Sequence, residues 1–350
     1  NQTMTAQVTG TTSVVSTAAK SGNNNSGDFL LETNTLSIST QHREKQNQTA
    51  EMVSDSLVES NSEETNVGNA KAGDYILTVH STTDSNSTTS EDNQTLHTPS
   101  GQQSPEVKTS RQTGDLYHGE YIYSEHADGV FELHATEINQ TSRTTRDSEG
   151  TTTIDQTDVG NKKEGHFKLA SYSETISVTT EEVVNQTQTS TSTTNQTVID
   201  DSEKTGDITG AYSYFGILTT LATSVATSSN GPATTTQRAS SFQETKYVGA
   251  GDTVTGEYTR EDISRADSTV EDVQVNQTLT ITAFTDTVSD GTSNRFVMAE
   301  KFVDTTRYEP TQLDGPAPGS SSETSWADNG YWRGWEWATG VMHAEWVMVT

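Results

Sequence analysis

Residues 47–92, NQTAEMVSDSLVESNSEETNVGNAKAGDYILTVHSTTDSNSTTSED, decide the fold because their pattern returns along the chain. Self-similarity at a fixed period is the sequence signature of a repeat architecture. The tripeptide Asn-Gln-Thr begins at Asn1, Asn47, Asn93, Asn139 and Asn185, so successive copies are 46 residues apart. A sixth unit starts near Gly231 without the tripeptide and with one residue deleted, and a seventh opens at Asn276.

A second signature, G-[ND]-x-x-(x)-G, keeps the same period and predicts a reversing turn, because Asn and Asp tolerate left-handed backbone. An aromatic residue follows two places after the second glycine, and apolar residues then alternate as on one face of a β-strand. We predict that each ring packs near the glycine two residues before it. The glycine pairs are Gly22 and Gly27, Gly68 and Gly73, Gly114 and Gly119, Gly160 and Gly165, Gly206 and Gly210, and Gly251 and Gly256, and the aromatic residues are Phe29, Tyr75, Tyr121, Phe167, Tyr212 and Tyr258.

The composition favours backbone hydrogen bonding over a large core. Of the 350 residues only 29% are hydrophobic, and the formal net charge is −29, values typical of a disordered chain. A repeated β-structure needs little apolar core per residue, and no long helical periodicity competes with the strand signals. We therefore predict an all-β, elongated, repetitive structure made of long antiparallel strands or of β-solenoid-like stacking.

The number of strands in each unit depends on which turn signals operate. Two turns per unit give strands approaching twenty residues. Further turn-like segments would give four strands per unit, and seven such units would form a seven-bladed β-propeller. The apolar content argues against closure, because Ser81 to Asn93 contains no large apolar residue. The further turn-like segments are Asp84-Ser-Asn86, Pro99-Ser-Gly101, Ala127-Asp-Gly129 and Asp147-Ser-Glu-Gly150.

Three regions follow from these patterns: six repeats in residues 1–275, a divergent seventh repeat in 276–314, and a Pro/Gly linker with a Trp-rich segment in 315–350. The seventh unit lacks the glycine turn. All five tryptophans lie at the end of the chain, where Val341 to Val349 alternates like a strand. That segment either caps the last repeat or docks elsewhere, and its candidate assembly residues are Trp332, Trp335, Trp337 and Trp346.

The sequence contains no catalytic motif, and we expect no enzyme activity. Nucleophile elbows, phosphate loops and H-E-x-x-H are missing, and the eight histidines are interpreted as scattered. With no cysteine, thiol chemistry and Cys-ligated metals are excluded. The acidic balance argues against nucleic acid, and no run of ~20 apolar residues predicts a membrane span.

Two kinds of non-catalytic site remain. A calcium site at Asp84-Ser-Asn86 or at Asp290 to Asn294 is the weaker of the two hypotheses, because neither stretch has the D-x-[DN]-x-[DN] spacing of calcium ligands. No other cofactor is expected. Asn-Gln-Thr also fits the N-x-[ST] glycan acceptor pattern, with a turn or ladder role for Asn and Thr as the alternative. The glycosylation candidates are Asn1, Asn47, Asn93, Asn139, Asn185, Asn195 and Asn276.

Taken together, these features resemble the Ser/Thr/Asp/Gly-rich repeat proteins of bacterial cell surfaces and extracellular filaments, of the planctomycete type. The resemblance implies an extracellular structural or adhesive role. We expect a subunit of an extracellular filament or surface layer, whose C-terminal strand joins the first unit of the next copy head to tail. The alternative is an adhesin stalk or carbohydrate-binding module that recognises surface glycans.

Overall fold

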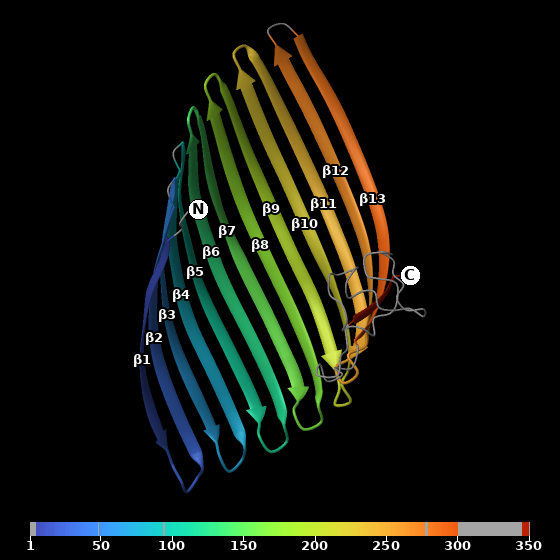
Figure 1. Ribbon diagram of the computed structural model, residues 1–350. Coiled ribbons are helices and arrows are strands. Elements are labelled where there is room, and N and C mark those ends of the chain that lie inside the picture. The colour runs from blue at the N-terminus through green and yellow to red at the C-terminus, as the bar shows by residue number, and fades with distance from the viewer. Residues whose placement is uncertain (1–4, 48, 94, 277–278, 300–344, 350) are drawn as a thin grey trace, which may run out of the picture.

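The structure is a computed structural model that describes residues 5–47, 49–93, 95–276, 279–299 and 345–349. These residues form one antiparallel sheet of fourteen strands, in which every strand pairs with its neighbours in sequence (Figure 1). The strands are β1 (Thr5–Gly22), β2 (Asp28–Gln46), β3 (Ala50–Asn69), β4 (Asp74–Asn93), β5 (Leu96–Asp115), β6 (Glu120–Asn139), β7 (Ser142–Asn161), β8 (His166–Asn185), β9 (Gln188–Gly206), β10 (Ala211–Asn230), β11 (Ala233–Asp252), β12 (Tyr258–Asn276), β13 (Leu279–Ala299) and β14 (Glu345–Val349).

The 46-residue period is the length of one long β-hairpin. Strands β4 and β5 have 20 residues each, and short loops at 94–95 and 116–119 complete the unit. At ~3.4 Å per residue, such strands span roughly 65 Å. The prediction of an all-β, elongated, repetitive structure is therefore confirmed in its long-stranded form, and the propeller alternative is wrong because the sheet is open.

The extra turn-like segments lie within strands, because pairing on both sides holds the backbone extended there. Even β5, which contains Pro99 and Pro105, stays in the sheet. The proline nitrogens cannot donate to a ladder, and the pairing of β5 with β6 is interrupted at both positions. The pairing of β5 with β4 continues through them. Tertiary context thus overrides local turn chemistry.

The sheet is a single layer with almost no core. Within the described residues, Ala127 is the one buried hydrophobic side chain. Stability therefore comes from the backbone ladder and from cross-strand side-chain pairs, each worth about 0.2–1 kcal/mol relative to an Ala–Ala pair.

Alternation along the strands gives the sheet two different faces. The aromatic face carries Phe29, Tyr75 and their equivalents, and the acidic face carries the intervening residues. Strand β3 illustrates the contrast. Its acidic-face positions include Glu51, Asp55, Glu59 and Glu63, whereas its aromatic-face positions include Ser54, Ser56, Ser60 and Ser62.

The aromatic residues occupy equivalent places, but five of the six rings pack on a different glycine from the one predicted, and the sixth, Tyr258, lies opposite Val297. Phe29 lies opposite Gly68, and a Cβ added to Gly68 would come within 2.8 Å of that ring. Tyr75 likewise covers Gly114, and Tyr121 covers Gly160. The partner is thus the first glycine of the next unit, because a side chain in a sheet contacts its cross-strand neighbour.

The Asn or Asp after the first glycine is also used differently from the prediction. No positive φ occurs at these positions; the left-handed residue is the second glycine, for example Gly119 at 84°. The Asn161 side chain, 6% exposed, accepts hydrogen bonds from Lys163 N and Glu164 N and donates to His118 O of the preceding loop. The residue therefore closes the loop and joins it to its neighbour.

Successive glycine loops stack on one another. Gly119 O accepts a backbone hydrogen bond from Lys162 N, and Gly73 O accepts one from Leu116 N. Side chains add to the column, since Lys71 Nζ donates to Asn25 O and Tyr117 Oη donates to Ala70 O. The ladder of the sheet thus continues through the loops at its lower end in Figure 1.

Candidate functional site

The Asn-Gln-Thr turns lie in a row at the opposite end of the sheet, the upper end in Figure 1. Asn93, Asn139, Asn185 and Asn276 are the last residues of β4, β6, β8 and β12. Adjacent turns contact each other, because Gln140 N donates to Thr95 O. The row runs along strand ends, so it does not cover the unpaired backbone of an edge strand.

In the three turns of this row whose residues are all described, φ is positive at the first loop residue alone. Gln140 and Gln186 both have φ 54°, and Gly231 of the sixth unit, followed by Pro232, has φ 59°. This is the pattern of a type II′ turn, which favours glycine at that place. Turn geometry therefore accounts for Gly231 but gives no reason for glutamine in the other units.

The candidate acceptor asparagines differ in their surroundings. Asn93, Asn139, Asn185 and Asn276 are exposed. Asn47 is half-buried, and its Oδ1 accepts hydrogen bonds from Thr49 and Ala50, which gives it a turn-closing role. Asn195 lies mid-strand in β9 and is exposed, whereas Asn1 lies outside the described residues.

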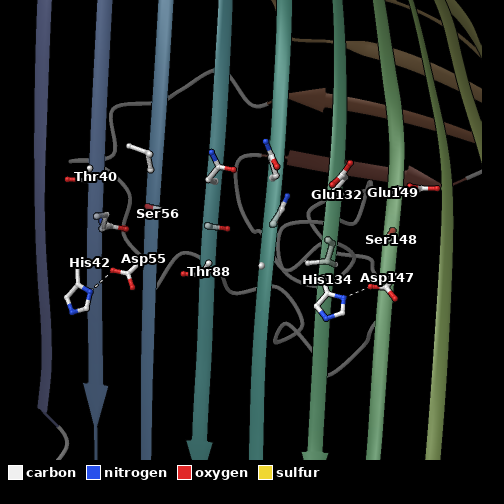
Figure 2. Close-up of a pocket in the computed structure, with 18 of the residues that line it drawn as sticks. Thr40, His42, Asp55, Ser56, Thr88, Glu132, His134, Asp147, Ser148 and Glu149 are labelled. Atoms are coloured by element: carbon white, nitrogen blue, oxygen red, sulfur yellow. Dashed lines mark hydrogen bonds and ion pairs between the residues drawn. The ribbon is translucent and has the colours of Figure 1, made fainter.

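A shallow trough crosses the middle of the acidic face from β1 to β8. Its side chains form two rows perpendicular to the strands (Figure 2). One row contains His42, Asp55, Thr88, His134 and Asp147, placed side by side by the strand register. The other contains Thr40, Leu57, Asn86, Gln103, Glu132 and Glu149.

Two cross-strand pairs of imidazole and carboxylate stand in this trough. His42 Nδ1 lies 2.6 Å from Asp55 Oδ1, and His134 is hydrogen-bonded to Asp147 (Figure 2). The two pairs are 92 residues apart, which is twice the period. His80 and His126 also differ by 46 residues, so the interpretation of the histidines as scattered was wrong, and their spacing would have revealed the pattern.

The pairs are too far apart to act together on one substrate atom. Asp55 and His134 are separated by three strand spacings, roughly 14 Å. All four side chains are exposed to solvent by about half, and neither pair has a nucleophile at hydrogen-bond distance. The trough can therefore hold polar groups by hydrogen bonding.

His126 stands on the same face between two carboxylates. Its Nδ1 lies 2.7 Å from Asp155 Oδ1, and its Nε2 lies 3.0 Å from Asp128 Oδ2. Hydrogen bonding to Asp155 and then to Asp128 raises the pKa of His126 above its ordinary 6.5. No group of three or more His, Asp or Glu suited to a metal ion occurs in the described part of the chain.

The predicted calcium segments are both within strands. Asp84 and Asn86 lie in β4 on the acidic face, and Asp290 lies in β13. No helix that is long and apolar enough to cross a membrane was found in the described residues.

The two lateral edges of the sheet carry the backbone groups available for pairing. Beside the outer edge of β1, no strand is found among the described residues. At the other side, the short β14 pairs with β13 over Arg295 to Ala299, which places Trp346 opposite Met298 of the same chain. Trp332, Trp335 and Trp337 lie outside the described residues.

The chain matches no protein-family model, and no curated protein matches its sequence.

Proposed function

We propose that this protein is a structural subunit of an extracellular filament or surface layer, which grows by strand pairing between the lateral edges of neighbouring copies. The observation that carries the proposal is the outer edge of β1, which pairs with no strand among the described residues. Proteins that avoid edge pairing use charges, prolines, bulges or short edge strands. Strand β1 has 18 residues in uninterrupted register with β2, contains no proline, and carries Lys20 as its one charged residue.

The opposite side of the sheet has a matching polarity. Strand β13 runs in the same direction as β1, because both are odd members of an antiparallel series. Strand β14 occupies the next, even position. A second copy whose β1 lies beside β14 would therefore continue the antiparallel order, and pairing of one copy's end with the next copy's beginning propagates without closing.

Proline substitution on β1 tests this edge. In a β-strand, neighbouring N–H groups point to opposite sides, so one of Ser13 and Val14 donates to β2 and the other points outward. Ser13→Pro and Val14→Pro are thus a matched pair. We expect electron microscopy to show filaments for the wild type. The outward-facing variant should keep the wild-type circular dichroism and lose the filaments; filaments in both variants, or none in the wild type, would contradict the proposal.

Extracellular placement and glycosylation belong to the same proposal. The exposed row of Asn93, Asn139, Asn185 and Asn276 supports it, since acceptor sites at loop tips leave room for a glycan. Intact-mass measurement on protein from its native source should give a mass above the 37.9 kDa of the bare chain. A mass equal to 37.9 kDa would remove the glycan part alone.

The trough on the acidic face favours a second candidate, a carbohydrate-binding stalk. Hydroxyl, amide and carboxylate groups such as those of Thr88, Asn86 and Asp55 are suited to hydrogen bonding with sugar hydroxyls. For this function, electron microscopy should show isolated rods, and glycan arrays should show binding that Asn86→Ala and Asp55→Ala weaken.

A further inference from the structure

A single-layer sheet leaves both faces without a protein partner, and the two faces differ in charge. Protein domains normally bury at least one face of a sheet against another layer. On β4, the aromatic-face residues Ser81, Thr83, Ser85 and Ser87 are half-buried, whereas the alternate acidic-face residues are exposed. Glu and Asp recur on the acidic face, with four on β3, so two acidic faces would repel each other. The aromatic face is the one that can lose water at low electrostatic cost.

Several hydroxyl groups on the aromatic face already have partners within the sheet. Ser148 and Thr179 are hydrogen-bonded at 2.8 Å, and Thr152 and Thr175 at 3.2 Å. Further pairs of the same kind join Thr89 to Ser54, Thr12 to Ser39 and Ser16 to Thr35. A hydroxyl that is hydrogen-bonded laterally costs less to remove from water than an unpaired one.

Two ion pairs on this face neutralise charged side chains locally. Lys108 Nζ lies 2.7 Å from Glu125 Oε1, and Arg260 lies 2.8 Å from Asp262. The aromatic rings lie over the glycines of the next strand, as the Tyr121 ring lies over Gly160. They therefore do not stand upright from the sheet. The result is a low surface of small side chains with paired polar groups.

We infer that the aromatic face is an interface between two copies of this chain, packed face to face with both acidic faces in water. Sheets stack at about 10 Å, a separation that small Ser, Thr, Ala and Gly side chains permit. Thirteen strand spacings of ~4.8 Å by strands of ~65 Å give a face of roughly 4,000 Å², several times the ~800 Å² per partner of a stable interface. A two-fold axis would make the contact self-complementary.

This inference does not depend on lateral assembly. Because two acidic faces repel each other, the stack is limited to two layers. In a filament, it predicts a thickness of two sheets. Edge pairing uses backbone groups of β1, whereas face pairing uses side chains in the middle of the strands, so substitutions can separate the two contacts.

A matched pair of double variants tests the interface. Ser87→Lys with Ser177→Lys adds two charges to the aromatic face, and Thr88→Lys with Thr180→Lys adds two to the acidic face of the same strands, β4 and β8. Both double variants are made in the full chain that carries the outward-facing β1 proline substitution, so that edge pairing is absent. Light scattering and analytical ultracentrifugation measure the oligomeric state of each variant and of this parent. Circular dichroism verifies that each variant remains folded.

We expect dimers in the parent and in the acidic-face variant. The aromatic-face variant should be monomeric, with the dimer Kd raised at least ~100-fold, because unpaired ammonium groups would be buried in the interface. A monomeric parent, whether its face is bare or covered by a glycan or another protein, would overturn the inference, as would equal Kd values for the two variants.

Discussion

The cross-strand contact between Tyr121 and Gly160 makes a sharp prediction about alanine substitution. A Cβ on Gly160 would lie 2.5 Å from His166 O and 2.9 Å from the Tyr121 hydroxyl. The first of these atoms belongs to the backbone, so the strand itself must shift. Overpacking of this kind costs about 1–3 kcal/mol, against the ~0.4–1 kcal/mol that Gly→Ala gains by restricting the unfolded chain. We expect Gly160→Ala to lower the free energy of unfolding by roughly 1–2 kcal/mol.

Gly129 supplies the control on the same face of the same pair of strands. A Cβ there would meet Pro105 O at 3.7 Å and Thr152 O at 3.9 Å, which are ordinary contacts. Gly129→Ala should therefore raise stability by about 0.4–1 kcal/mol. Urea denaturation followed by circular dichroism measures both variants. Hydrogen exchange of β6 and β7 replaces it if the repeats unfold separately. Equal effects of the two substitutions would refute the glycine–aromatic packing as a constraint on sequence.

Three further predictions concern the turns and the histidines. Gln140→Gly should stabilise the β6–β7 hairpin by about 1 kcal/mol in urea denaturation, because it removes a non-glycine residue from the left-handed region. Gly231→Ala should destabilise the β10–β11 hairpin because it places a Cβ at a positive φ, although no atom lies within 4 Å of that Cβ. Asn161→Ala should lower the free energy of unfolding by about 1–3 kcal/mol, because it leaves the N–H groups of Lys163 and Glu164 unpaired. Asn161→Asp should lower it less, because Asp115 and Asp252 accept the equivalent hydrogen bonds in their own units. Because its pKa is raised in the folded state, His126 stabilises the fold below pH about 6.5, and this contribution is lost as the pH rises through the folded pKa. The urea midpoint of the wild type should therefore fall relative to that of His126→Gln across this pH range. Parallel curves of midpoint against pH would contradict the assignment.

The period, the strand class and the positions of both turns follow from sequence alone. Asn-Gln-Thr and the glycine signature both mark true loops, and the alternating apolar residues after Tyr75 lie on one face of β4. The histidine pairs were also accessible, because His42 and His134 stand at one offset within their units. The pairing of these histidines with Asp55 and Asp147 could not be predicted from the sequence. A cross-strand partner is fixed by the strand register, which depends on the lengths of the loops at both ends of the strand.

Tertiary structure alone decided which residues meet. Local patterns made Gly119 the expected neighbour of Tyr121, yet the ring covers Gly160, 39 residues further along the chain. They also marked turns at Asp84 and Pro99, where the structure has continuous strands. The physical reason is the same in both cases: local sequence sets what a segment can adopt, whereas hydrogen bonds and side-chain contacts from two neighbouring strands determine which conformation is stable. A single sheet without a core makes that dependence complete, because nearly every contact beyond the loops joins one strand to the next.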